Sequence, residues 1–330
     1  QSVDLIATEK FESVVGLMKK AVSMGMANTT GHDFFEDMDV RFKKSNRVVV
    51  PTGIPRLDAH DIFRGGLGKG EIGVVTANTG VGKSHWLVQM GVNAMLAGRN
   101  VVHYTFELSE ESVGIRYDSC LTDIDSNEIV KRKDEVKEFY KNVDTGRLFI
   151  KEYPTGSASV MTLKNHLDKL LLKDFKPHVI IVDYADIMRS TRSFDSLRHE
   201  LKLVYEELRN LAMELNIPVW TASQANRDSA NSNIVGLENM SEAYGKAMVA
   251  DVVVSISRKS TEKAGGTGRL YIAKNRAGRD GLLFPLSIDT ARSKFQILDE
   301  NSLTLNEALQ EDKNDMKSRL REKWKDVRGM

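Results

Sequence analysis

Cysteine and long apolar runs are both scarce in this sequence. Its 330 residues include one cysteine, Cys120, which excludes an internal disulfide framework and favours a reducing compartment. No apolar run approaches the roughly 18 residues of a membrane span. The first residues also lack the basic and apolar segments of a signal peptide. We therefore expect a protein of the cytoplasm, of a bacterium or a phage-infected host, with no membrane partner.

An excess of charge of one sign is lacking as well. The 47 basic residues nearly balance the 46 acidic ones, and the net charge is +1. Binding to nucleic acid would therefore depend on local basic patches. The chain also lacks an initiator methionine, so we expect a fragment whose preceding domain is missing. Its 41% hydrophobic and 28% charged residues are typical of one large α/β domain or of a domain with appendages.

The most informative motif is a glycine-rich turn, Ala77–Ser84, between an apolar run and a helical pattern. Residues 71–76 predict a buried strand and residues 85–90 the start of a helix, which is the context of a phosphate-binding loop. Backbone N–H groups of such a turn, together with the helix N-terminus, face phosphate oxygens. The strict pattern begins with glycine and this one with alanine, but its Gly-x-Gly-Lys-Ser core is intact.

This loop predicts binding of a nucleoside triphosphate with Mg²⁺. Lys83 would reach the β- and γ-phosphates, and the Ser84 hydroxyl would hold the metal ion. The residues that we expect to contact the nucleotide are Asn78, Thr79, Gly80, Val81, Gly82, Lys83, Ser84 and His85.

Three further apolar runs end in residues that can act on a bound nucleotide: Glu107, Asp183 and Gln224. The carboxyl ends of parallel strands meet at the ligand crevice of an open α/β sheet. There Glu107 would polarise the attacking water, or it would instead cap the helix that begins near Ser109. Asp183 would hold Mg²⁺ through water. The uncharged amide of Gln224 would sense a γ-phosphate.

Two polar segments and a pair of cations follow the later strands. A basic loop, Arg189–Ser193, precedes an amphipathic helix over 196–215, and residues 226–244 form a long polar stretch without periodicity. Loops of this length in a compact domain are usually functional or disordered. Lys274 and Arg276 stand at the end of a strand over 269–273, either as a functional pair or as the solvated tip of a hairpin.

The two ends of the chain differ from its centre. Residues 1–46 combine an amphipathic helix with a long polar loop, so the helix packs either on its own domain or on a neighbouring subunit. Residues 47–300 are expected to form the globular α/β domain. Residues 301–330 are expected to form a charged helical tail.

Strand order, spacing and strand-end residues together resemble the RecA-type ATPase domain of DnaB-family hexameric replicative helicases, over roughly residues 10–300. The likeness is greatest to the replicative helicases of large tailed phages. The motifs that carry it are Gly31-His32-Asp33, Gly146-Arg147-Leu148, Tyr153-Pro154-Thr155-Gly156 and Ile180-Ile181-Val182-Asp183-Tyr184.

The resemblance implies a role for each candidate residue. Lys83 and Ser84 would be the phosphate-loop pair, and Glu107 the catalytic glutamate. Asp183 would be the Mg²⁺-associated acid and Gln224 the γ-phosphate sensor. Lys274 and Arg276 match a Lys-x-Arg element that reaches into the ATP site of the neighbouring subunit. The residues expected to contact DNA are Arg189, Arg192, Arg227, Ser241, Glu242 and Tyr244. Ser241 stands where the bacterial family often has arginine, and Tyr244 where it often has glycine.

The resemblance also implies a fold, an activity and partners. The fold would be an α/β RecA-like phosphate-loop core, a mostly parallel twisted sheet with helices on both faces. Copies of the chain would form a ring, expected to be hexameric, that hydrolyses ATP at subunit interfaces. It would move along single-stranded DNA, 5′ to 3′ by likeness, and unwind duplex DNA. A primase and a helicase loader are the other expected partners. By the same resemblance we expect this sequence to lack the family's N-terminal collar domain.

Two alternatives share this core. A RecA-like recombinase would form an open filament on DNA, but such proteins usually carry a Phe-x-x-Ala segment upstream of the core, and none precedes residue 50. A KaiC-like regulatory ring ATPase would use its ATP cycle for signalling, and the Gly-Gly-Leu-Gly-Lys-Gly run at residues 65–70 suits that group too. An ATPase rate that nucleic acid leaves unchanged would favour the regulatory ring.

Overall fold

The computed structural model describes residues 31–42, 47–226, 229, 232–239, 244–298 and 305–328. The chain divides into two compact units, residues 1–47 and residues 48–330. The helix expected within residues 1–27 lies outside the described residues. In the first unit the described part contains the short helix α3 (Met38–Phe42). Among the described residues, no helix is both long and apolar enough to cross a membrane.

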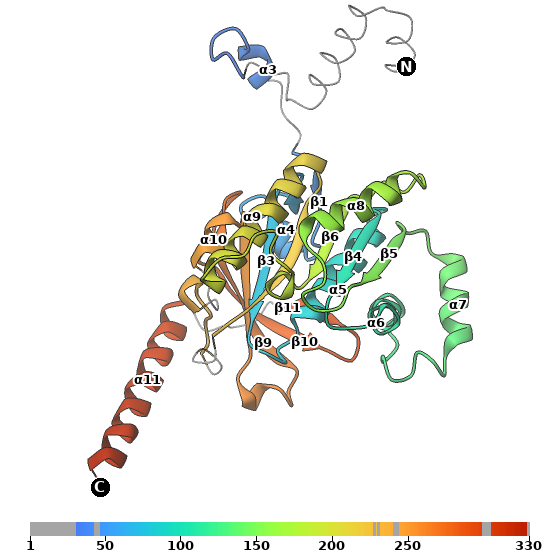
Figure 1. Ribbon diagram of the computed structural model, residues 1–330. Helices are drawn as coiled ribbons and strands as arrows, with labels where there is room; N and C mark the ends of the chain where they lie inside the picture. The colour runs from blue at the N-terminus through green and yellow to red at the C-terminus, as the bar shows by residue number, and fades with distance from the viewer. Residues whose placement is uncertain are drawn as a thin grey trace, which may run out of the picture. The chain divides into compact units, whose positions relative to one another are not determined.

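A nine-stranded sheet forms the centre of the second unit (Figure 1), and a separate sheet has two strands. The strands are β1 (Val49–Val50), β2 (Leu67–Gly68), β3 (Ile72–Ala77), β4 (Val101–Thr105), β5 (Leu148–Glu152), β6 (Val179–Asp183), β7 (Val219–Gln224), β8 (Val252–Ser257), β9 (Thr267–Asn275), β10 (Leu283–Asp289) and β11 (Lys294–Ile297). In the two-stranded sheet β1 pairs with β2 in antiparallel fashion. In the large sheet the β8–β3–β7–β6–β4–β5 part is parallel throughout, and β9, β10 and β11 extend it in antiparallel fashion beyond β8. The expected mostly parallel sheet is therefore confirmed.

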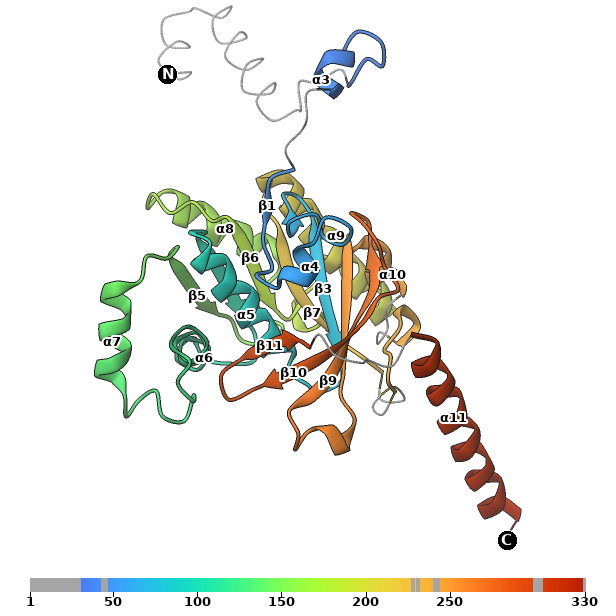
Figure 2. The ribbon, with the colours of Figure 1, turned by 180° about the vertical axis from the view of Figure 1, so that it is seen from behind.

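Helices cover both faces of the sheet, as expected (Figures 1 and 2). The helices of this unit are α4 (Pro55–Asp58), α5 (Lys83–Leu96), α6 (Glu110–Thr122), α7 (Lys133–Asn142), α8 (Val160–Leu171), α9 (Leu197–Leu215), α10 (Tyr244–Val249) and α11 (Leu305–Arg328), with 3-10 turns η1 (Ala185–Ile187), η3 (Leu237–Asn239) and η4 (Ser260–Glu262). Successive side chains of a strand point to opposite faces. On β3, Val75 and Ala77 therefore pack into the core beneath α5 and α6, whereas Ile72 and Val74 pack into the core beneath α8, α9 and α10.

The β10–β11 hairpin was not predicted from the sequence. Pro285 stands inside β10 and provides no N–H for a ladder, so the residues around it do not resemble an interior strand. The structure nevertheless pairs Pro285 with Arg269 of β9. Phe284, Leu286 and Ile288 alternate as buried residues along the strand. This hairpin packs against α5.

Helix α5, which follows the phosphate loop, packs closely against α6, and this contact holds α5 in position. A Cβ atom added at Gly91 of α5 would lie 2.0 Å from the hydroxyl oxygen of Tyr117 and 2.9 Å from Ile181 Cδ1. Tyr117 is buried, and its hydroxyl is hydrogen-bonded to His103 at 3.0 Å, so it is not free to move aside. A glycine is required at this contact because the two helices approach too closely for any side chain.

Gly91→Ala is expected to destabilise the fold by about 1–3 kcal/mol through overpacking. Gly114→Ala is the matched control, because Gly114 lies inside α6 and an added Cβ there meets only Ile150 Cδ1, at 3.9 Å. The control should be more stable by about 0.5–1 kcal/mol, since alanine favours a helix over glycine. Urea denaturation measures both. A neutral Gly91→Ala variant would contradict the close packing of α5 on α6.

Candidate nucleotide-binding site

The phosphate loop runs from the end of β3 to the start of α5, as the sequence predicted. Gly80 and Gly82 have φ angles of 74° and 121°, a backbone region that other residues rarely adopt. Lys83 Nζ donates to the carbonyl oxygen of Ala77 at 3.2 Å, so its side chain lies back over the loop. A pocket of about 320 Å³ opens there, lined by Thr79, Gly80, Gly82, Lys83, Ser84, His85, Glu107, Arg116, Tyr184, Gln224 and Thr290. The loop and two of the three strand-end candidates therefore meet in one pocket.

Asp183, the third strand-end candidate, lies beneath this pocket with only 2% of its surface exposed. The pKa of this carboxyl is raised to about 6, mainly by burial and to a smaller extent by the charge of the nearby Glu107. A hydrogen bond with Ser84 and the charges of Arg116 and Lys83 act in the opposite direction. Burial also lowers the pKa of Lys83, against the attraction of Asp183 and Glu107. The structure thus brings Lys83, Ser84, Glu107 and Asp183 together.

These residues fit a magnesium ion. Asp183 Oδ1 is buried and has no hydrogen-bond partner, while the Ser84 hydroxyl lies beside the same carboxylate. Mg²⁺ prefers oxygen ligands and usually binds through one or two protein groups, with phosphates and water completing its shell. Within the described part of the chain, no group of three or more His, Cys, Asp or Glu residues could hold a metal by itself. A metal here would therefore depend on bound phosphate.

Glu107 is exposed, lines the pocket and lies two residues after the end of β4. Its carboxylate accepts a hydrogen bond from Tyr184, and the pKa of that tyrosine is raised to about 12, first by burial and then by the charge of Glu107. The alternative role as a helix cap is wrong. Ser109 is the N-cap of α6, and its side chain accepts the backbone N–H of Ser112. Glu107 is thus not used as a helix cap, and its side chain lines the pocket.

Gln224 ends β7 next to the phosphate loop. Parallel pairing sets Gln224 opposite Ala77, the last residue of β3. Its side-chain Nε2 donates to the Thr79 hydroxyl at 2.8 Å, and its backbone N–H donates to Asp186 Oδ2 at 3.1 Å. The side-chain amide is thus held against the phosphate loop.

Sequence reasoning missed Arg116. It lies on α6, lines the pocket, and is close enough to Asp183 and Glu107 for their charges to oppose the lowering of its pKa by burial. Burial and the charge of Arg116 lower the pKa of His85 to about 4, so this histidine is neutral at pH 7. No motif around residue 116 indicates a binding role, because only the packing of α6 on α5 brings the side chain to the pocket.

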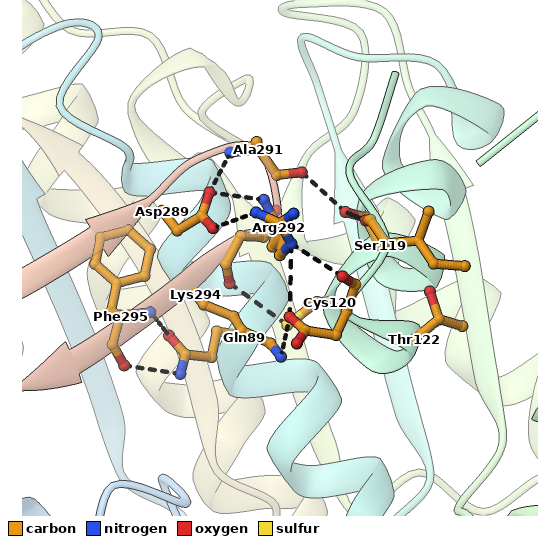
Figure 3. Close-up of polar contacts among 12 residues, drawn as sticks. Gln89, Ser119, Cys120, Thr122, Asp289, Ala291, Arg292, Lys294 and Phe295 are labelled. Atoms are coloured by element: carbon orange, nitrogen blue, oxygen red, sulfur yellow. Dashed lines mark hydrogen bonds and ion pairs between the residues drawn. The ribbon is translucent and has the colours of Figure 1, made fainter. Parts of the chain in front are cut away.

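The β10–β11 hairpin was also missed. It is hydrogen-bonded to α5 and to α6, the two helices that border the pocket (Figure 3). Gln89 of α5 exchanges two hydrogen bonds with the backbone of Phe295, of 3.0 and 2.8 Å. Ser119 of α6 donates to the carbonyl of Ala291 at 2.9 Å, and Cys120 lies against the carbonyl of Ser293. Thr290, which lines the pocket, lies in the connection between these two strands.

Lys274 and Arg276 lie at the opposite end of the strands from the phosphate loop. The backbone N–H of Arg276 bonds to Asp251, whose own N–H bonds to Ile72, the first residue of β3, whereas the loop follows the last. Because β3 has six residues, about 20 Å separate the two ends at about 3.3 Å per residue. The structure therefore does not bring this pair together with the other candidates.

The cation pair is not a solvated hairpin tip either. Arg276 forms a 3.0 Å ion pair with the buried Asp251 and donates to the carbonyl of Met248. Lys274 Nζ donates to the carbonyls of Ala247 and Met248, at 2.7 and 3.1 Å. Both cations are thus held against the C-terminal end of α10, while about half of the Arg276 side chain stays exposed.

The predicted DNA contacts fall into two groups. Arg189 and Arg192 are exposed on the loop between η1 and α9. Arg227, Ser241 and Glu242 lie outside the described residues, and Tyr244 is the first residue of α10. The loop that carries Arg189 and Arg192 begins from the same sheet edge as the nucleotide pocket, because η1 directly follows β6.

Asp183→Asn is expected to stabilise the chain by roughly 2–3 kcal/mol at pH 8 without nucleotide and metal. The pKa is about 6 in the fold against an ordinary value of 3.8. Above pH 6 the carboxylate is charged in both states, so the folded state bears its full desolvation cost. Below about pH 4 it is protonated in both states and the cost disappears. Urea denaturation at the two pH values measures the difference.

Asp289→Asn serves as a control of opposite sign. Burial raises the pKa of Asp289, but hydrogen bonds from Arg292 outweigh it and the net pKa is lowered. This carboxylate therefore stabilises the fold above its ordinary pKa, and its removal should cost stability at pH 8. A loss of stability at pH 8 in Asp183→Asn as well would contradict the picture of a destabilising buried charge.

Comparison with known proteins agrees with the family and the fold expected from the sequence. The family model of the DnaB-like helicase C-terminal domain matches residues 49–296. A DnaB-like replicative helicase of Enterobacteria phage T4 is 29% identical over 259 residues, which cover 74% of this chain and 54% of that protein. The chain thus spans about half the length of this relative.

Two solved structures share the fold. An isolated ATPase domain superimposes with a TM-score of 0.65 at 18% identity, covering 79% of this chain and 95% of that one. A DnaB-like replicative helicase, solved in a study of its interactions with primase, gives 0.69 at 16% identity, covering 90% of this chain and 75% of that one. The family match covers most of the described sheet and the whole nucleotide pocket. The chain therefore belongs to the DnaB-like helicase C-terminal domain family.

Proposed function

We propose that this chain is the motor domain of an ATP-dependent replicative DNA helicase, which hydrolyses ATP at the interfaces of a ring and moves along single-stranded DNA. One observation carries the proposal beyond family membership. The phosphate loop and the Lys274–Arg276 pair stand at opposite ends of the same strands. On this proposal a single chain holds half a site at each end, and a second copy would complete each half.

The residues of the pocket would divide the chemistry as follows. Lys83 binds the β- and γ-phosphates, and Glu107 takes a proton from the attacking water. Ser84 and Asp183 hold Mg²⁺, which neutralises phosphate charge when bound. Gln224 contacts the γ-phosphate. Arg276 of the neighbouring copy, planar and permanently charged, stabilises the charge on the transferred phosphoryl group, and Lys274 supports it.

The remaining parts of the chain would serve assembly and DNA. Residues 47–300 form the motor, residues 1–46 dock on a neighbouring subunit, and residues 301–330 form a separate tail. Single-stranded DNA passes the loops around Arg189 and residues 239–244 and is held mainly through its phosphates. We further propose a hexameric ring, 5′-to-3′ movement in the cytoplasm, and interactions with a primase and a loader. Membership of this family favours the helicase over the recombinase and the regulatory ring.

Glu107→Gln is expected to bind ATP but to hydrolyse it about 10²–10⁴-fold more slowly, because only the activation of water is removed. Lys83→Ala should lose binding and turnover together, since the phosphates lose their main cation. Phosphate release and nucleotide binding, measured side by side, separate the two variants. Turnover at the wild-type rate in Glu107→Gln would exclude this residue as the base.

The function itself is tested by the ATPase rate with and without single-stranded DNA. A helicase motor is expected to hydrolyse ATP faster when DNA is bound, and a rate indifferent to DNA would favour the regulatory-ring alternative. In an Arg189→Ala, Arg192→Ala double variant, DNA affinity should fall. Its dependence on log salt should flatten by about 0.7 per lost phosphate contact. An unaltered salt dependence would assign the DNA path to residues 226–244 alone.

A further inference from the structure

A buried ion pair joins helix α10 to the turn that follows β6. Lys246 of α10 is 1% exposed, and its Nζ lies 2.8 Å from Oδ1 of Asp186 in η1. The ammonium group also donates to the Ser223 hydroxyl at 3.3 Å and lies 5.6 Å from the centre of the Tyr205 ring. Neither member of the pair was singled out in the sequence.

The same carboxylate holds the backbone of the proposed γ-phosphate sensor. Asp186 Oδ2 accepts the backbone N–H of Gln224 and the hydroxyl of Ser223, both at 3.1 Å. Asp186 Oδ1 accepts the hydroxyl of Tyr205, on α9, at 2.8 Å. One carboxylate therefore bonds at once to β7, α9 and α10.

Helix α10 has a functional candidate at each end. It begins at Tyr244, directly after residues 240–243 of the predicted DNA-contacting segment. At its other end the carbonyls of Ala247 and Met248 accept hydrogen bonds from Lys274, and Met248 also accepts one from Arg276. Lys246 lies between the two ends, so the ion pair connects the middle of this helix to the carboxylate that bonds to Gln224.

The energetics of the pair require its two members to move together. An ammonium group that is 1% exposed cannot be left without its carboxylate except at a large desolvation cost. A shift of Gln224 when the γ-phosphate arrives or leaves therefore moves Asp186 through the N–H bond. The carboxylate then carries Lys246 and α10 with it. The displacement thereby reaches both ends of the helix.

We propose that Asp186 and Lys246 are positioning residues that couple occupancy of the γ-phosphate site to the DNA-contacting segment before α10 and to the Lys274–Arg276 pair after it. The inference rests on the proposed function, since it assumes that ATP and single-stranded DNA are the two ligands. Such coupling is reciprocal, so each ligand strengthens the binding of the other. The coupling also links the state of one ATP site to Lys274 and Arg276, which would act in the ATP site of the neighbouring copy.

The test measures the affinity of the full chain for single-stranded DNA with a non-hydrolysable ATP analogue and with ADP. In the wild type the ratio of the two affinities is expected to be about 5–150, the usual range of allosteric coupling. In Asp186→Asn, in Lys246→Met and in the double variant the ratio should fall to near one. All three variants should still bind the ATP analogue.

Thermal stability separates positioning from a purely structural role. Each single variant removes the opposite charge from a buried charged group and should melt on the order of 10 °C lower. The double variant removes both charges and should regain most of that stability, yet its affinity ratio should stay near one. Recovery of the ratio along with the stability would show that the pair only holds the fold together.

Glu262→Gln is the matched control. It breaks the Arg269–Glu262 pair, whose side chains are 10% and 24% exposed and which joins β9 to η4. The control should lose stability and keep the wild-type ratio. Loss of the ratio in this control as well would trace the effect to general destabilisation and overturn the inference.

The remaining outcomes distinguish this inference from the proposed function. Variants of Asp186 and Lys246 that keep the wild-type ratio overturn the coupling and leave the helicase proposal intact. A wild type that binds DNA equally in both nucleotide states also overturns the coupling alone. A chain that binds no single-stranded DNA in any nucleotide state refutes the proposed function and the inference together.

Discussion

Parallel pairing of β3 with β7 on one side and β8 on the other is the constraint on which the other features depend. It sets Ala77 opposite both Gln224 and Ile256, so the phosphate loop and the sensor share one edge of the sheet. The antiparallel return of β9 then carries Lys274 and Arg276 to the other edge. The same hydrogen-bond ladders that build the pocket thus keep the cation pair away from it.

Two carboxylates at this edge of the sheet, Asp183 and Asp186, differ in how they are bonded, and the buried charge of Asp183 lowers the stability of the fold. Asp183 is kept charged above its raised pKa by Ser84, Arg116 and Lys83, and it has one oxygen still unpaired. Asp186, three residues later, is satisfied from several elements at once. One carboxylate is therefore poised for a ligand and the other ties the surrounding elements together. A destabilising buried charge of this kind is expected where stability has been exchanged for function.

Much of the site could be predicted from the sequence because parallel strands deliver their last residues to one edge. Glu107, Asp183 and Gln224 each end an apolar run and needed no tertiary information. Arg116 and Lys246 could not be found this way, since each lies on a helix and reaches its partners only through packing. The β10–β11 hairpin was missed because Pro285 lies within β10, and a proline is not expected in an interior strand.

The central claim is that the ATP site closes only between two copies, and mixing two inactive variants tests it most directly. The Lys83→Ala variant lacks an intact phosphate loop. The Arg276→Ala variant lacks the arginine that would stabilise the phosphoryl group in the neighbouring copy. Neither variant should therefore hydrolyse ATP alone. After subunit exchange some interfaces pair an intact loop with an intact Arg276, and ATPase activity should partly return. Mixtures that stay inactive despite demonstrated exchange would contradict the account.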